Sequence, residues 1–357
     1  MEDVMDNKTP KQIESAIYAL RMDRQYLSHR ANEGEYDSLF RLMSPVPTIY
    51  WTSPGSAPSM YHRAGFDDLV HNNKRRKDRT ILKGRYQGGS VGYVEAGDLE
   101  LFAAIYRKKI ERLSPLQREI VDIIEREGPM TINYIKEITG YLTKEITPQM
   151  QKLQEAYIVY EEQHESGDER YWYLFEDEFR DANLEQYTYA QALKEVLLRF
   201  AEVLPFYEAK QAKSFYKLPQ KDINAALAEL IKDGALLYEN GYALPADVSL
   251  IRGSAVIPDK SVFVLHRSDF LARADEYWIK DEFKHETYGL LHYLLIDGRF
   301  AGAVHGRFTF GPPEIEDVTL SLSQSETEAR KDEILEAVNL IHDREGSPVK
   351  RYCGAEL

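Results

Sequence analysis

The 357-residue sequence contains a single cysteine, Cys353, and no long apolar run. One cysteine excludes an internal disulfide framework and any thiolate metal cluster. No segment approaches the roughly 20 consecutive apolar residues that span a bilayer. The charged start Met1–Lys11 lacks the apolar core of a signal peptide. These absences favour a cytoplasmic protein without a membrane segment.

Positive charge is also scarce. The chain has 45 Lys and Arg against 59 Asp and Glu, a formal net charge of -14. This charge argues against a protein that coats nucleic acid with its whole surface. Residues 1–112 hold 18 basic and 15 acidic side chains, whereas the remaining 245 residues hold 27 and 44. The cationic character is therefore concentrated near the N-terminus.

A repeating pattern is present, and it is clearest between Leu113 and Phe175. A first helix has apolar residues at spacings of three and four and ends at Gly128. A short second helix ends at Gly140, and a third begins at Thr143 with Pro148 expected in its first turn. Two strand-like runs joined by the polar tip 164–169 then indicate a hairpin. Three helices followed by a hairpin are typical of a winged helix-turn-helix.

This pattern favours DNA, most simply duplex DNA, as a partner, because a helix-turn-helix presents a recognition helix to the major groove. The polar residues of the candidate recognition helix that we expect to contact DNA are Lys144, Gln149, Gln151 and Lys152. Winged helices also serve as protein–protein modules and as scaffolds, so the pattern alone leaves those alternatives open.

The same pattern recurs on both sides of this segment. We predict an α+β protein with tandem winged helix-turn-helix domains at 1–112, 113–182 and 183–250. A small β-rich, barrel-like domain at 251–357 follows, with strands within 262–270, 288–310 and 317–324 and a terminal helix at 326–343. Its histidines do not have the spacing of metal ligands, so no metal or cofactor is expected; they are His266, His285, His292 and His305.

The densest run of positive charge lies in the first predicted domain. Seven cations and one anion occur within twelve residues, and the cations are Lys74, Arg75, Arg76, Lys77, Arg79, Lys83 and Arg85. In an acidic protein this run is the best candidate for phosphate contacts. The alternative is a solvated helix face, because charge runs are common on exposed helices.

A proline-rich segment, Ser44–Met60, precedes the basic run and contains Tyr50 and Trp51. Its prolines exclude a long regular element. The two aromatic rings are either packed in the core, as such rings usually are, or available to stack on a base.

Two stretches, ILKGRYQGGSVGYVEAGDLELF from Ile81 and YGLLHYLLIDGRFAGAVHGRF from Tyr288, complete a pattern of three winged helices followed by a β-rich domain. This arrangement resembles the winged-helix DNA glycosylases that excise alkylated and crosslinked bases, the AlkZ/YcaQ-like family. The resemblance covers most of the chain. It implies a protein that cups DNA and a Gln-x-Gln or Gln-x-Asp pair from the first winged helix beside the glycosidic bond.

The sequence departs from the family at that catalytic pair. The expected place after Met43 reads SPVPTIYW, without glutamine or aspartate, and the Gln149-Met150-Gln151 run lies on the wrong helix, so we interpret it as a coincidence. An N7-alkylated purine is already a cationic leaving group, so an amide or carboxylate that places water would suffice. Candidate substitutes are Asp67 and Asp68, with Tyr50 stacking on the base.

Three hypotheses follow from the sequence. The first is a DNA glycosylase with a variant catalytic group, and the second is a non-catalytic winged-helix DNA-binding or regulatory protein. The third, a protein-interaction module, is kept because the C-terminal two thirds are acidic.

Overall fold

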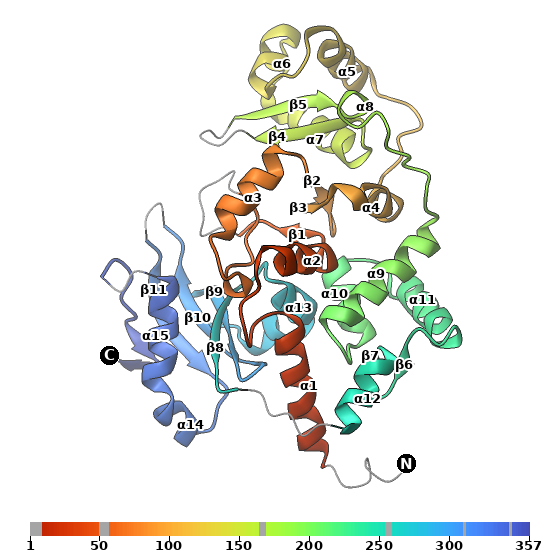
Figure 1. The fold of residues 1–357 in the computed structure, drawn as a ribbon. Helices are drawn as coiled ribbons and strands as arrows, with labels where there is room; N and C mark the ends of the chain where they lie inside the picture. Colours follow the sequence, from red (N-terminus) through yellow and green to blue (C-terminus); the bar gives the residue numbers. More distant parts are fainter. Residues whose placement is uncertain (1–8, 50–56, 164–168, 254–258, 310–311, 343–344) are drawn as a thin grey trace. The chain divides into compact units, whose positions relative to one another are not determined.

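The computed structural model describes residues 9–49, 57–163, 169–253, 259–309, 312–342 and 345–357 (Figure 1). The chain is α+β and divides into two compact units. The first unit is Met1–Ala31, Phe200–Phe215 and Ala228–Leu357, and the second is Asn32–Arg199 and Tyr216–Leu227. These units are larger than the four predicted domains, whose boundaries stay a prediction.

The second unit begins with helices and a small sheet. Its elements up to residue 106 are α2 (Glu33–Met43), β1 (Val46–Pro47), η2 (Tyr61–Arg63), α3 (Asp68–Lys77), β2 (Ile81–Tyr86), β3 (Ser90–Glu95), η3 (Ala96–Asp98) and α4 (Leu99–Tyr106). The strands form one sheet in the order β1-β3-β2, with antiparallel pairs throughout. After Arg79 the chain therefore runs through a strand, a glycine-containing turn, a second strand and a helix.

The segment with the clearest repeat also has the expected succession of elements. It contains α5 (Pro115–Glu127), α6 (Ile132–Thr139), α7 (Thr143–Glu155), β4 (Val159–Gln163), β5 (Arg170–Leu174) and α8 (Phe175–Glu178). Ser114 and Gln117 cap α5 reciprocally, and Gly140 ends α6 in the left-handed conformation that glycine tolerates best. Strands β4 and β5 are antiparallel, as the hairpin prediction requires.

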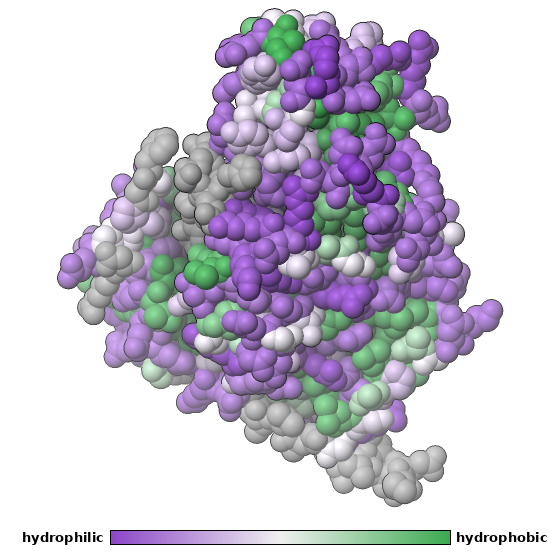
Figure 2. Space-filling model, turned by 45° about the horizontal axis from the view of Figure 1, so that its top comes forward, coloured by the Kyte–Doolittle hydropathy of each residue, from purple (hydrophilic) through white to green (hydrophobic). Residues whose placement is uncertain are grey.

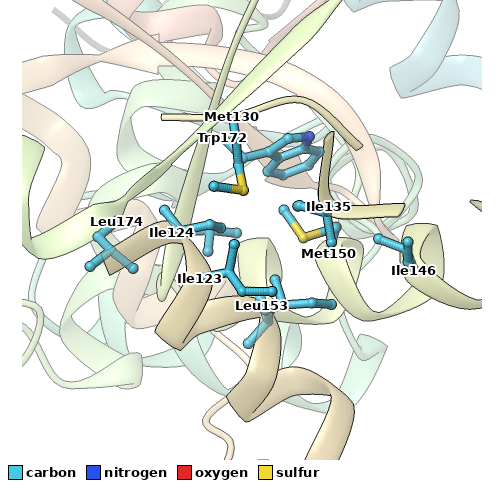
Figure 3. Packing of buried hydrophobic residues seen from close by; sticks show 11 residues of the cluster. Ile123, Ile124, Met130, Ile135, Ile146, Met150, Leu153, Trp172 and Leu174 are labelled. Atoms are coloured by element: carbon cyan, nitrogen blue, oxygen red, sulfur yellow. The ribbon is translucent and has the colours of Figure 1, made fainter. Parts of the chain in front are cut away.

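One local expectation in this segment is wrong. Pro148 lies inside α7, in its second turn, because the helix already begins at Thr143. Proline has no N–H, so the carbonyl of Lys144 has no intrahelical donor there. The three helices nevertheless enclose one apolar cluster, in which Trp172 of β5 covers Ile135, Met150 and other side chains (Figure 3).

Three helices each have residues in both units: α9 (Tyr189–Val203), α10 (Ala209–Tyr216) and α11 (Gln220–Lys232). A short hairpin follows, formed by β6 (Leu237–Tyr238) and β7 (Tyr242–Ala243). Its turn contains Asn240 and Gly241, both with positive φ, a combination that is typical of tight hairpin turns.

The first unit contains α1 (Pro10–Arg24), which starts with a capping box of Thr9 and Gln12. Its apolar face packs against Val248 and Ile251 of α12 (Pro245–Gly253). Arg24 of α1 forms an ion pair of 2.5 Å with the buried Asp247 of α12. The helix therefore shares a core with residues far away in the sequence, among them Phe206 and Ala243.

A six-stranded sheet forms the C-terminal part of the first unit, in the order β13-β12-β11-β10-β9-β8. Its strands are β8 (Val262–His266), β9 (Gly289–Ile296), β10 (Arg299–Arg307), β11 (Glu314–Leu320), β12 (Arg351–Tyr352) and β13 (Ala355–Glu356). The helices of this part are α13 (Phe270–Glu282), α14 (Gln324–Ala329) and α15 (Lys331–Ile341).

The burial of this sheet explains its sequence. Side chains of α15 share a core with one face of β9 and β10, while Trp278 of α13 stacks edge-on against Phe300 of β10. Cover on both faces gives strands that read as continuous apolar runs rather than as an alternation.

Two sequence predictions for this part are corrected. The expected strand 262–270 ends at His266, because Asp269 caps α13, a helix that the sequence analysis missed. The expected terminal helix 326–343 is two helices, α14 and α15.

No helix in the described part of the chain is long and apolar enough to cross a membrane. Hydrophilic side chains cover most of the face shown in Figure 2, and the hydrophobic ones gather in small groups. The mean hydropathy of -0.49 agrees with that surface.

Candidate nucleic-acid interface

The densest run of positive charge does not form one exposed patch. Arg75 and Arg76 of α3 and Lys83 of β2 are buried, with 7%, 2% and 7% of their surface exposed. Burying a cation is expensive unless a partner charge compensates it. Each of these three has such a partner inside the second unit, and this corrects the expectation that all seven cations reach phosphate.

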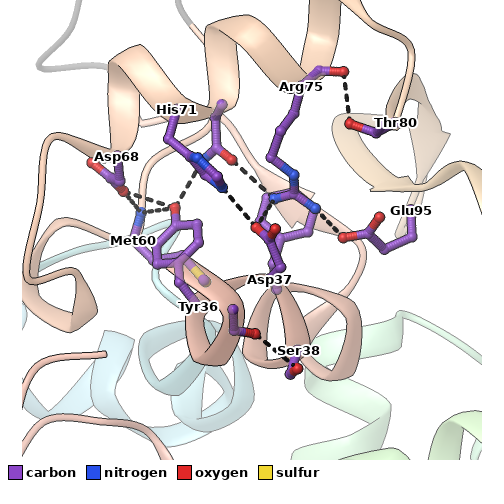
Figure 4. Close-up of polar contacts among 12 residues, drawn as sticks. Tyr36, Asp37, Ser38, Met60, Asp68, His71, Arg75, Thr80 and Glu95 are labelled. Atoms are coloured by element: carbon purple, nitrogen blue, oxygen red, sulfur yellow. Dashed lines mark hydrogen bonds and ion pairs between the residues drawn. The ribbon is translucent and has the colours of Figure 1, made fainter. Parts of the chain in front are cut away.

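Arg75 is held on three sides (Figure 4). Its guanidinium is 3.0 Å from Asp37 and pairs with Glu95, and it donates to the Asn72 amide oxygen at 3.0 Å. The Phe40 ring lies under it at 4.7 Å. Burial raises the pKa of Glu95, and the adjacent Arg75 opposes that rise. The cluster fixes α3 to α2 and β3.

The other buried cations join β2 and α3 to the hairpin β4–β5. Lys83 pairs with Glu161 of β4, which is fully buried, and burial lowers the lysine's pKa while Glu161 opposes that effect. Arg76 lies 3.9 Å from Glu162 of the same strand. These pairs are structural contacts between segments about 80 residues apart in the sequence.

Arg79 and Arg85 are half-buried and are also engaged. Arg79 pairs with Glu178 and lies over the rings of Tyr160 and Tyr173, each at 5.4 Å. Arg85 donates to the Gln154 side chain at 2.8 Å. Of the seven predicted phosphate contacts, Lys74 and Lys77 are the exposed ones.

The two candidate catalytic carboxylates have different positions. Asp67 is exposed and caps α3, where Oδ1 accepts from the N–H groups of Leu69 and Val70 at 3.1 Å each. Asp68 is 3% exposed, and burial raises its pKa. The two aspartates are neighbours in the sequence, yet Asp67 lies on the surface and Asp68 lies in the interior.

Asp68 belongs to a buried polar network (Figure 4). Its Oδ2 accepts from the Tyr36 hydroxyl at 2.8 Å and from the Met60 N–H at 2.6 Å, and its Oδ1 accepts from Ser59 at 3.0 Å. Asn72 in turn donates to the Tyr36 hydroxyl at 2.7 Å. Both carboxylate oxygens are occupied, so Asp68 holds α2, α3 and the Ser59–Met60 backbone together.

An open groove of about 550 Å³ runs between α2 and α3, beside this network. Asp37 lines this groove; its side chain is 41% exposed, and its Oδ1 is 2.8 Å from His71 Nε2. Lys74 and Arg41 also line the groove, and the Arg41 guanidinium donates to both carboxylate oxygens of Asp98 at 2.8 Å. A carboxylate oriented by an imidazole and a guanidinium can hold a water molecule or a cationic group.

The sequence analysis missed Asp37 and His71 as candidate functional residues. The available signal was the spacing of four between Glu33, Asp37 and Arg41, which places three charges on one face of a helix.

The predicted polar residues of α7 are accessible. Lys144, Gln151 and Lys152 are exposed, and Gln149 is half-buried, while the opposite face of the helix enters the apolar cluster. If Gln151 or Lys152 had been buried, it could not have belonged to a DNA-contact surface on α7.

The segment around Tyr50 is only partly visible. Tyr50 and Trp51 lie outside the described residues, so their predicted roles are untested. Residues 44–49 are described: Val46 pairs with Tyr93 of β3, and Ser44, Val46 and Ile49 are buried. Residues 44–49 therefore contribute mainly packing, whereas Ser59 and the Met60 N–H at the end of the segment donate hydrogen bonds to Asp68.

Four histidines of the β-rich part are buried: His266, His292, His305 and His342. Burial lowers the pKa of His266, His305 and His342 to about 4. Among the residues with described positions, no group of three or more His, Cys, Asp or Glu side chains could hold a metal ion.

Comparison with known proteins shows a likeness at the level of structure alone. No protein-family model and no curated protein matches the chain. Among solved structures, the Streptomyces sahachiroi DNA glycosylase AlkZ aligns with a TM-score of 0.65 over 95% of this chain and 98% of that chain. The two share a fold. Their sequence identity is 11%, which shows no more than that.

Proposed function

We propose that this chain is a DNA-repair protein that binds duplex DNA and hydrolyses the N-glycosidic bond of alkylated or crosslinked bases. The observation that carries the proposal is the likeness to a DNA glycosylase over almost the whole length of both chains. The succession of three helices and a hairpin in α5–β5 supports it, and we infer that this segment and its neighbours are winged helices.

The chemistry requires a group that orients water beside an oxocarbenium-like sugar. Asp68 is poorly suited because donors occupy both of its oxygens. Asp67 is exposed, and the half-exposed Asp37 lies in a groove with cations at its rim. We therefore propose the water-orienting role for Asp37 or Asp67, with the exposed Lys74 as a contact to the DNA backbone.

The experiment is a glycosylase assay with a duplex that carries N7-methylguanine, followed by alkaline cleavage at abasic sites. We expect abasic sites with the unmodified protein. Of the two variants Asp37→Asn and Asp67→Asn, the one that removes the water-orienting carboxylate should lower the rate of base release by about 100-fold or more. Glu33→Gln, at the rim of the same groove, is the matched control. Full activity in both aspartate variants would remove the proposed carboxylates.

A second candidate is a DNA-binding protein of the same fold without glycosylase activity. It is favoured by residues 44–49, where the family resemblance places a catalytic pair and this chain has Ser, Pro, Val, Pro, Thr and Ile. Tight duplex binding without abasic sites, across alkylated and crosslinked substrates, would select this candidate. Absence of duplex binding would reject both.

A further inference from the structure

A second groove, distinct from the one at Asp37, runs between α5 and α7 of the second unit. It is open and has a volume of about 1040 Å³. Arg118, Asp122 and Arg126 follow one another at successive turns of α5, and Gln149 and Lys152 lie one turn apart on α7. Polar side chains from two helices thus line the same groove.

The groove carries an excess of positive charge in an acidic protein. Its cations are Arg112, Arg118, Arg126 and Lys152, and its anions are Glu119 and Asp122. Arg126 pairs with the neighbouring Glu127 at 2.8 Å. Within the part of the chain that the structure describes, no ion pair within 4.0 Å involves Arg112, Arg118 or Lys152. These three cations are available to an external anion.

The contrast with the α3–β2 run is informative. There the buried cations have carboxylate partners, so they have no charge left to offer a ligand. Here the cations are exposed and unpaired, and two of the three are arginines, whose fork of donors suits phosphate oxygens.

The N-terminus of α5 also favours an anion in the groove, but it supplies few free backbone N–H donors. Pro115 has no N–H, and the N–H of Gln117 is already bound by Ser114 at 3.2 Å. The helix end therefore contributes mainly its positive dipole. Binding to the groove must come chiefly from the side chains.

We infer that this groove binds the sugar-phosphate backbone of duplex DNA. The inference rests on the proposed function and specifies one of its contact surfaces. With its 13 residues, α5 is about 20 Å long, enough to follow several phosphates. A backbone strand in the groove lies beside α7, whose exposed Lys144 and Gln151 then face the adjoining DNA groove.

The test neutralises the unpaired cations together, as R112Q/R118Q/K152Q, in the full chain. Duplex affinity is measured by fluorescence anisotropy between about 50 and 200 mM salt. We expect the slope of log affinity against log salt to fall by about 0.9 for each lost contact, and affinity to fall on the order of 100-fold at 0.1 M salt. Thermal unfolding confirms that the variant is folded.

The matched control removes the same charge elsewhere, with three exposed lysines of the first unit replaced by glutamine; they are Lys260, Lys280 and Lys284. This control must keep the slope of the unmodified protein. An unchanged slope in R112Q/R118Q/K152Q, while the unmodified protein binds duplex, overturns the groove and leaves the proposed function standing. No duplex binding by the unmodified protein overturns both.

A competition arm separates DNA from an acidic protein partner. Unlabelled duplex must displace the labelled duplex much more effectively than a polyglutamate peptide of equal charge. Equal displacement would assign the groove to an acidic polypeptide and overturn the assignment to phosphate.

Discussion

Two sets of cations in the second unit differ in how many of them are buried and paired with carboxylates, and the number of basic residues per segment does not show this difference. The run from Lys74 to Arg85 has seven cations in twelve residues, yet its central members are buried against Glu95, Glu161 and Glu162. The cations between α5 and α7 come from scattered positions, and three of them have no acidic partner among the described residues. The comparison teaches that available charge depends on pairing and burial rather than on local abundance.

The largest effect on stability is expected when one partner of a buried ion pair is removed. Lys83→Met removes the nearer partner of the fully buried Glu161 and leaves it with Arg170 at 3.6 Å, which should cost about 3 kcal/mol in the free energy of unfolding. Lys152→Met, at an exposed and unpaired site, costs less than about 0.5 kcal/mol. Urea denaturation measures both. Equal costs would show that Lys83 and Lys152 do not differ in role.

A companion variant tests the cause. Adding Glu161→Gln to Lys83→Met should recover part of the lost stability, because the buried charge that has lost its nearer partner is then removed as well. A double variant less stable than Lys83→Met alone would contradict this explanation.

The next prediction compares the buried ion pairs of the second unit with the buried histidines of the first unit. His266, His305 and His342 have pKa values of about 4 when folded, below the ordinary 6.5. As pH falls from 6.5 to 4, the unfolded state therefore takes up protons that the folded state refuses. The free energy of unfolding falls on the order of a few kcal/mol over that window.

Hydrogen-exchange protection factors locate this pH effect. Amides of β9 and β10 should lose protection between pH 6.5 and 4. His342→Leu should reduce the loss, whereas the exposed His29→Leu should not change it. Protection of the sheet that is constant down to pH 4 would refute the assignment of neutral buried histidines.

Adjacent aspartates give a smaller contrast of the same kind. Asp68→Asn disturbs a carboxylate with three donors and should cost about 1–3 kcal/mol. Asp67→Ala removes an exposed helix cap and should cost about 1 kcal/mol. Thermal unfolding compares them. A larger loss at Asp67 would reverse our account of which residue is structural.

Much of the local structure was predictable from the sequence, because local chemistry determines it. Thr9 with Gln12 predicts the start of α1, and Asn240 with Gly241 predicts the β6–β7 turn. The helix α13 was missed because the apolar strand before it obscured Asp269, the residue that caps it.

The candidate site was less predictable, because long-range packing builds it. Nothing near Lys83 in the sequence announces Glu161, which lies 78 residues away. Asp37 and His71, 34 residues apart, meet only when α2 and α3 pack together. Composition placed the positive charge in the N-terminal part, but it could not show which cations are internally neutralised.

The smallest expected effect concerns the exposed remainder of the basic run. Lys74 and Lys77 are its exposed members, so K74Q/K77Q can remove at most two phosphate contacts and lower the salt slope by at most about 1.8. Stability should change by less than about 0.5 kcal/mol, since neither side chain is buried. Arg75→Gln is the informative counterpart: it should destabilise the second unit by opening the cluster with Asp37 and Glu95, yet leave the salt slope of the folded fraction unchanged. A slope that falls with Arg75→Gln and stays constant with K74Q/K77Q would mean that the buried arginine, and not the exposed lysines, reaches DNA.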